Sequence, residues 1–228
     1  MADRHFTPAL FAFLRDLKAN NDRAWFAENR DRWLADVRDP CLRFITDLGA
    51  PLMAVSPAFR ADPRPQGGSM FRLHRDIRFS KDKSPFKTAV GLHFRHENGR
   101  DAHTPGFYLQ LEPGNCFAAV GLWRPDGPSL KLVRDRLAAD PDSWRRAVGG
   151  KAFKAAFEVS GESLVRVPRG YPADHPLAEQ LKLKDITAWA PLTQKQVTSE
   201  GFLDGFAGLC RTGGSLVQWI CGALGQPY

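Results

Sequence analysis

The sequence has no apolar run long enough to cross a membrane. A spanning helix needs about 18 consecutive apolar residues, and the longest run extends only from Cys116 to Trp123. The start, MADRHFTPALFAFLRDL, carries Arg15 and Asp16 inside its apolar stretch. It also lacks the basic beginning and the small-residue cleavage site of a signal peptide. We therefore expect a cytoplasmic protein with no membrane partner.

Cysteine is scarce as well. The four cysteines, Cys41, Cys116, Cys210 and Cys221, form no C-x-x-C pair and lie within apolar runs. Such residues are typical of reduced thiols in a cytoplasmic protein, not of a disulfide framework or a zinc site. We predict that all four belong to the core.

Familiar catalytic motifs are also missing. The sequence contains no G-x-G-x-x-G, G-x-x-x-x-G-K-[ST], G-x-S-x-G or H-E-x-x-H, which leaves the common nucleotide-dependent enzymes and serine or zinc hydrolases unsupported. Ligand-type side chains do occur at His93, His96, Glu97, Asp101 and His103. Residues three apart in a strand point to opposite faces, so we assign them no metal. We predict neither a metal nor a cofactor.

The composition is typical of a globular protein with a net positive charge. Of the 228 residues, 43% are hydrophobic and 25% are charged, which is enough for a sizeable core. The 32 Lys and Arg residues outnumber the 25 Asp and Glu residues and give a formal charge of +7. This balance favours anionic partners without specifying which anion.

The order of the expected elements indicates an α+β fold. Three helices are expected before residue 55: one begins at Thr7-Pro8, a second spans Asp22 to Arg38, and Pro40 separates it from the third. Strands are expected at 70–74, 88–95, 106–112 and 115–123, the last two joined by a tight turn at Pro113-Gly114. Later residues are mainly helical, with minor strands at 157–160 and 165–167 and two terminal helices, 193–209 and 215–224, separated by Gly213-Gly214.

We therefore predict a single α+β domain over residues 1–228, helical in 1–55, with the sheet in 69–124 and helices in 129–228. The central sheet is expected to be antiparallel, with helices from the N-terminal and C-terminal parts packed on it.

The positive charge is concentrated in one stretch, residues 72–87, which we call the basic segment. Its six cations are Arg72, Arg75, Arg78, Lys81, Lys83 and Lys87, and its two acids are Asp76 and Asp82, which leaves a net charge of +4. Forked guanidinium donors beside Ser and Thr hydroxyls suit phosphate or carboxylate recognition. The alternative is a solvated loop whose cations pair with these two acids, because exposed pairs form easily and contribute only ~0–1 kcal/mol.

Four stretches of the sequence resemble a known family. They are FLRDLKANNDRAWFAENR, FRLHRDIRFSKDKSPFKT, PGFYLQLEPGNCFAAVGLW and PRGYPADHPLAEQLKLK. Together they resemble an uncharacterised, largely bacterial domain-of-unknown-function family over nearly the whole chain. The resemblance implies a single-domain protein, but it brings no activity and no catalytic residues.

Strand alternation divides the sheet into two faces. The core face is expected to carry the large apolar residues, with Phe71 and Leu73 among them. The second face collects Tyr108, Gln110 and Glu112 around a floor of small residues, Ala89, Gly91, Ala119 and Gly121. A floor of this kind lets a ligand approach the backbone closely. A second layer of helices packed on the small residues is the alternative.

We infer that the protein binds an anionic ligand, such as a phosphorylated compound, in a basic pocket beside the sheet. The predicted ligand-binding residues are Arg72, Arg75, Arg78, Lys83, Lys87, Tyr108 and Gln110. Whether the protein is an enzyme stays open; if it is, Glu112 or His74 is the expected general base.

Two other classes of function remain. A nucleic-acid-binding protein would stack bases on Phe79, Phe86 and Phe117. A structural or partner-binding module would have its second face closed by helices. The sequence leaves the ligand's identity and the oligomeric state open.

Overall fold

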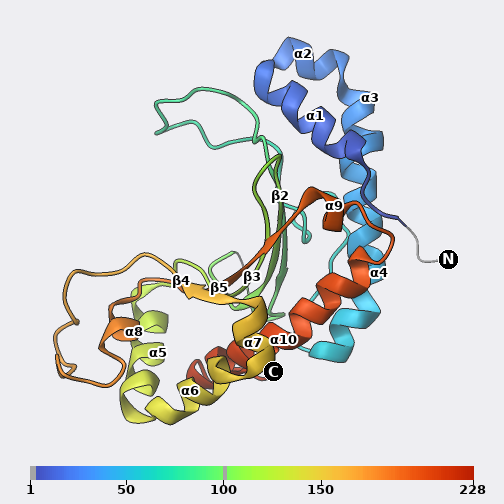
Figure 1. Cartoon of the computed structure of the whole chain (residues 1–228). Helices are drawn as coiled ribbons and strands as arrows, with labels where there is room; N and C mark the ends of the chain where they lie inside the picture. Colours follow the sequence, from blue (N-terminus) through green and yellow to red (C-terminus); the bar gives the residue numbers. More distant parts are fainter. Residues whose placement is uncertain (1–3, 100–101) are drawn as a thin grey trace.

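Five antiparallel strands form the centre of the molecule, in the order β1-β2-β3-β5-β4. The computed structural model describes residues 4–99 and 102–228. The strands are β1 (Val90–Arg95), β2 (Gly106–Leu111), β3 (Cys116–Leu122), β4 (Glu158–Ser160) and β5 (Ile186–Leu192). Helices precede, interrupt and follow them, so the predicted α+β fold with a central antiparallel sheet is confirmed (Figure 1).

The hairpin of β2 and β3 has the expected register. Tyr108 lies opposite Ala119 and Gln110 opposite Phe117. Gly114 has a φ of +80°, which glycine adopts without strain. The Pro113-Gly114 turn therefore decides which residues share a face.

Strand β5 was not expected from the sequence, although it pairs with β3 on one side and β4 on the other. Its stretch ITAWAPL contains Pro191, which has no N–H to donate to a ladder. Strand β4 pairs only with Thr187, Ala188 and Trp189, so Pro191 lies beyond that ladder. The minor strand at 157–160 is confirmed as β4, whereas residues 165–167 form no strand.

The N-terminal helices begin as the sequence predicts. Thr7 caps α1 (Pro8–Ala19) by accepting a hydrogen bond from Ala9 N–H, and Asp22 caps α2 (Arg23–Glu28) in the same way through Trp25 N–H. The following helices are α3 (Arg30–Trp33), the π-helical turn η1 (Leu34–Arg38) and α4 (Asp39–Val55).

The expected break at Pro40 is wrong. The helical backbone passes from α3 through η1 into α4, and Pro40 lies in the first turn of α4. A proline removes one N–H and crowds the preceding turn. The wider π turn just before Pro40 makes room for the proline ring and tolerates the missing N–H, so the helix continues.

The C-terminal half supplies the remaining helices. They are α5 (Gly127–Ala139), α6 (Pro141–Gly149), α7 (Lys151–Ala156), α8 (Ala178–Lys182), α9 (Gln194–Val197) and α10 (Phe202–Ala223). Helix α10 packs against α4 and β3, and Figure 1 shows α4 and α10 on the same side of the sheet. All four cysteines are free and buried, as predicted.

The expected break at Gly213-Gly214 is also wrong, because α10 continues through both glycines. Their role is close packing. A Cβ at Gly213 would lie 2.7 Å from a methyl carbon of Val120 on β3, and one at Gly214 would collide with the Tyr228 hydroxyl. Gly213 therefore brings α10 close to the core face of the sheet, and Gly214 leaves room for Tyr228.

We predict that Gly213→Ala destabilises the fold, although alanine is the better helix former. Relative to Gly208→Ala in the same helix, the free energy of unfolding should fall by about 1–3 kcal/mol, because the new methyl overpacks against Val120. Only an Arg211 side-chain nitrogen, 3.8 Å away, lies near a Cβ at Gly208. Urea denaturation of both variants measures the difference, and equal stability would contradict the packing role.

Candidate functional site

The second face of the sheet carries two adjoining cavities. The first, which we call the basic cleft, has a volume of about 560 Å³ and lies between the basic segment, the end of α1 and strands β1 and β2. Its charged lining comprises Lys18, Arg75, Lys87 and Asp82; its polar lining comprises Asn21, Ser84, Thr88, Tyr108 and Gln110; and its apolar lining comprises Phe71, Phe86, Ala89 and Gly91. The second cavity, which we call the aromatic pocket, has a volume of about 200 Å³ and shares Phe71, Tyr108 and Gln110 with the first.

The floor of the second face lies where the sequence predicts it. Ala89 and Gly91 line the basic cleft, and Ala119 and Gly121 line the aromatic pocket. The space above Gly91 is narrow: a Cβ there would lie 2.6 Å from the Tyr108 hydroxyl oxygen and 2.9 Å from the Phe71 ring. A glycine is therefore needed where Tyr108 crosses the face.

The predicted strand at 70–74 is wrong, and the expectation that Phe71 belongs to the core face is wrong with it. Phe71 N–H donates to Gly91 C=O across the edge of β1, but the chain then turns away. From there it pairs with itself, since Lys87 N–H donates to Leu73 C=O and Arg75 N–H donates to Pro85 C=O. The Phe71 ring consequently lies on the second face, 6.0 Å from the Tyr108 ring.

A single side-chain amide fixes the basic segment to the N-terminal helices. Asn21, between α1 and α2, donates from Nδ2 to Phe86 C=O at 3.0 Å and accepts from Phe86 N–H through Oδ1 at 3.1 Å. The Phe86 ring is buried and lies 4.5 Å from the Phe26 ring of α2. This contact places Ser84 to Lys87 beside the end of α1, where Lys18 also lines the cleft.

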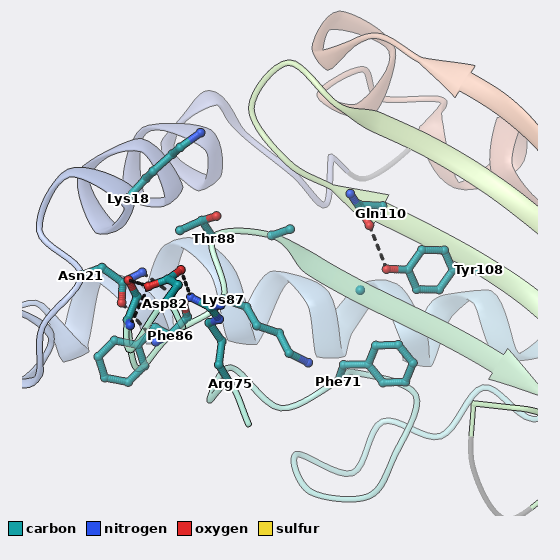
Figure 2. Close-up of a pocket in the computed structure, with 13 residues that line it drawn as sticks. Lys18, Asn21, Phe71, Arg75, Asp82, Phe86, Lys87, Thr88, Tyr108 and Gln110 are labelled. Carbon is teal, nitrogen blue, oxygen red and sulfur yellow. Dashed lines mark hydrogen bonds and ion pairs between the residues drawn. The ribbon is translucent and has the colours of Figure 1, made fainter. Parts of the chain in front are cut away.

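Two of the predicted cations, Arg75 and Lys87, line the cleft, and they differ in their electrostatic surroundings. Arg75 forms an ion pair with Asp82, and the Asp82 pKa is held well below its usual range by hydrogen bonds from Ser84 and by that guanidinium. Burial lowers the pKa of Lys87, and the nearby charge of Arg72 adds to the effect. The Lys87 ammonium lies 5.4 Å from the centroid of the Phe71 ring, toward which Figure 2 shows it extending. Lys87 is therefore a poorly solvated cation at the base of the cleft.

Tyr108 and Gln110 form the polar edge of the cleft. The Tyr108 hydroxyl donates to Gln110 Oε1 at 3.1 Å, and Gln110 Nε2 donates to Glu112 Oε2 at 3.0 Å (Figure 2 draws the first of these). Burial, with the charge of Glu112, raises the pKa of Tyr108 to about 12, so the hydroxyl keeps its proton. The structure thus brings together four of the predicted ligand-binding residues: Arg75, Lys87, Tyr108 and Gln110.

The other predicted ligand-binding residues do not line the cleft. Arg72 is exposed. The Arg78 side chain is 76% exposed and pairs with Asp76, whose pKa it lowers to about 2. Lys83 is exposed and donates to Ile77 C=O at 2.9 Å. The expectation of a solvated, internally paired loop therefore describes this part of the basic segment.

The two expected general bases also lie outside the cleft lining. Glu112 accepts hydrogen bonds from Gln110 and Asn115 at the end of the hairpin. His74 is exposed, with its ring 5.2 Å from the Phe86 ring. Neither side chain faces the space between Lys87 and Tyr108.

Sequence reasoning missed Lys18 and Asn21 as lining residues, whereas Ser84 and Thr88 belong to the Ser and Thr hydroxyls noted beside the cations of the basic segment. Asn21 follows the first helix and carries no binding motif of its own. Lys18 and Asn21 reach the cleft through a contact with Phe86, 65 residues away from Asn21 along the chain. A local sequence pattern cannot predict a contact between residues so far apart along the chain.

The ligand-type side chains near β1 do not converge. His96 is buried with Nε2 2.9 Å from Pro227 C=O, whereas the His103 ring stacks on Trp123. Asp101 lies outside the described residues. Within 4–99 and 102–228, no group of three His, Cys, Asp or Glu side chains is placed to hold a metal ion. Over the same ranges, no helix is long and apolar enough to cross a membrane.

The comparison with protein families agrees with the four stretches noted in the sequence. The profile of the conserved hypothetical protein family DUF2461 matches residues 9–219, nearly the whole chain. The chain belongs to this family. No curated protein matches the sequence. The function of this DUF2461 protein must therefore be argued from its own residues.

We predict that Asn21→Ala loosens the basic segment. The substitution leaves the N–H and C=O of the buried Phe86 without their partner, which should cost about 1–3 kcal/mol of stability. Hydrogen exchange of the Phe86 and Lys87 amides should accelerate, while exchange in β2 and β3 stays slow.

Asn20→Ala is the matched control, because the Asn20 amide bonds only to Asp16 C=O of its own helix. Equal exchange at residues 84–88 in the two variants would contradict the role of Asn21.

Proposed function

We propose that this DUF2461 protein binds a small anionic ligand, a phosphorylated compound foremost, in the basic cleft. The observation that carries the proposal is the convergence of Lys18, Arg75 and Lys87 on one cavity whose only acid among the described lining residues, Asp82, is already paired with Arg75. Ammonium and guanidinium groups beside hydroxyls are the usual donors to phosphate.

The state of Lys87 supports an anionic ligand in particular. Its lowered pKa means that the folded protein holds this charge at a cost, since burial removes water from the ammonium. A bound anion would return the lost electrostatic stabilisation. Ser84 and Thr88 lie beside it and offer hydroxyl donors to the same anion.

The cleft is better suited to binding than to proton transfer. Its carboxylate, Asp82, has a pKa well below the usual range and is engaged by Ser84 and Arg75. The pKa of the Tyr108 hydroxyl is raised to about 12, so this group keeps its proton at neutral pH. A general base works best with a pKa near the working pH, and neither group meets that requirement.

We predict that Lys87→Met abolishes stabilisation by phosphate without destabilising the free protein. The direction of the stability change follows from the lowered pKa of Lys87. A lysine whose pKa is lower in the folded than in the unfolded state destabilises the folded protein while it is charged. Removing that charge therefore removes the destabilisation. The methionine still packs on Phe71. For the wild type, phosphate at ten times its dissociation constant should add about 1.4 kcal/mol, a rise in Tm of a few degrees.

Arg78→Met is the control, because it removes one cation of the same segment outside the cleft. Thermal melts with and without millimolar phosphate or pyrophosphate compare the three proteins. The wild type and Arg78→Met should respond alike, and Lys87→Met should not respond. If all three respond alike, the cleft is not the anion site.

A second candidate function rests on the tip of the basic segment. Phe79 is 95% exposed, the Arg78 guanidinium lies 5.9 Å from its ring, and Lys81 and Lys83 are exposed beside it. An exposed ring among cations suits stacking on an unpaired base. Phe86, expected from the sequence as a second stacking residue, is buried instead.

For this second function we predict that Phe79→Ala weakens binding of a labelled single-stranded oligonucleotide by about tenfold, since a stacked base contributes about 1–3 kcal/mol. Fluorescence anisotropy at increasing salt measures the affinity, which should fall steeply with salt. Lys87→Met serves as the control and should bind the oligonucleotide as the wild type does. An unchanged affinity in Phe79→Ala excludes the loop tip as a nucleic-acid site.

A further inference from the structure

The aromatic pocket lies beside the basic cleft on the same face of the sheet, and the cations of the cleft do not line it. Phe71, Tyr108, Phe117, Trp123 and Trp189 contribute rings to its lining. Phe71 belongs to the segment beside β1, Tyr108 to β2, Phe117 to β3 and Trp189 to β5. The pocket therefore lies across the sheet and not along one strand.

Four of these rings form a continuous row. The ring centroids are 6.0 Å apart from Phe71 to Tyr108, 5.8 Å from Tyr108 to Phe117 and 4.4 Å from Phe117 to Trp189. The Lys87 ammonium lies 5.4 Å from the first ring of the row. A half-buried cation and an apolar aromatic surface are thus joined directly at Phe71.

Four side chains of the aromatic pocket, those of Tyr108, Gln110, Thr187 and Trp189, already form hydrogen bonds. Tyr108 and Gln110 bond to each other, and Gln110 also donates to Glu112. Trp189 Nε1 donates to Thr187 Oγ1 at 2.9 Å, and Thr187 donates to Ser160 C=O at 2.7 Å. His93 and Thr104 have partners as well.

An occupant rich in hydrogen-bonding groups would have to break these bonds, and each unpaired buried polar group costs free energy. An apolar occupant leaves them intact. The rings around the pocket favour a flat aromatic group, because offset and tilted ring contacts add to the gain from apolar burial.

We propose that the ligand of this protein is an aromatic anion of the aryl phosphate class, with its phosphate in the basic cleft and its ring on the aromatic row. The proposal rests on the proposed function, because the same ligand spans both cavities. Tyr108 and Gln110, which line both, lie where the ring joins the charged group. The row supplies affinity and selectivity, and the cations supply charge recognition.

Three probes test this ligand class by isothermal titration calorimetry: inorganic phosphate, 1-naphthyl phosphate and hexyl phosphate. The wild type should bind 1-naphthyl phosphate at least about tenfold more tightly than inorganic phosphate, through burial of the rings. Hexyl phosphate should bind more weakly than the naphthyl compound. If hexyl phosphate binds as tightly, the aromatic class is wrong, and if naphthyl phosphate binds no better than phosphate, the aromatic pocket takes no part.

The variant Ala119→Leu locates the ring. Ala119 lines the aromatic pocket but not the basic cleft, so a leucine fills the pocket and leaves the cations in place. Its affinity for inorganic phosphate should match the wild type, while its affinity for 1-naphthyl phosphate should fall to that for phosphate. Unchanged naphthyl phosphate binding would place the ring elsewhere and overturn the proposal.

Phe117→Leu provides a second test if Ala119→Leu does not fold, because it removes one ring of the row at nearly constant size. It should lower naphthyl phosphate affinity severalfold and leave phosphate affinity unchanged. The two proposals fail in different ways. If the wild type binds none of the phosphate probes, the proposed function is wrong. If it binds inorganic phosphate and 1-naphthyl phosphate with equal affinity, only the present inference is wrong.

Discussion

The candidate site depends on the pair of hydrogen bonds between the Asn21 amide and the backbone of Phe86. Together with the packing of the Phe86 ring on Phe26, they join the turn between α1 and α2 to the end of the basic segment. With Phe86 buried against Phe26, the residues that follow are carried into β1 and Lys87 is held under partial burial. Lys18 of α1 and Lys87 consequently line one cavity. A structural amide thus helps to decide which charges of the basic segment lie beside the sheet.

A second constraint keeps the opposite side of the sheet accessible. Helix α10 lies close to the core face because Gly213 lets it approach Val120, and α4 packs against α10 on the same side. The helical layer therefore accumulates on one face, while the other keeps a floor of alanine and glycine. Antiparallel sheets tolerate such asymmetry, since one covered face already gives them a core. Rings and cations line the cavities of the second face.

Local patterns predicted local structure well and distant contacts poorly. The Pro113-Gly114 turn fixed the register of β2 and β3, and alternation then placed Tyr108, Gln110 and the small-residue floor on one face. Strand β5 was missed because Pro191 interrupts its pattern. Pro40 and Gly213 were taken as helix breakers, although a π turn and close packing explain them. The positions of Lys18, Asn21 and Phe71 depend on contacts across the fold, and charge alone did not separate Arg75 and Lys87 from the solvated Arg78.

The exposed end of the basic segment satisfies its own hydrogen bonds. Arg78 pairs with Asp76, and Lys83 donates to Ile77 C=O. The part of the segment next to the sheet is held instead by the hydrogen bonds of Asn21 to Phe86 and of Lys87 N–H to Leu73 C=O. The hydrogen bonds at Asn21 and Leu73 do not involve Phe79, and the ion pair of Arg75 with Asp82 links the cleft to the rest of the loop. A change of charge or size at Phe79 would therefore alter the exposed surface of the loop, while the hydrogen bonds that hold Lys87 beside the sheet stay in place.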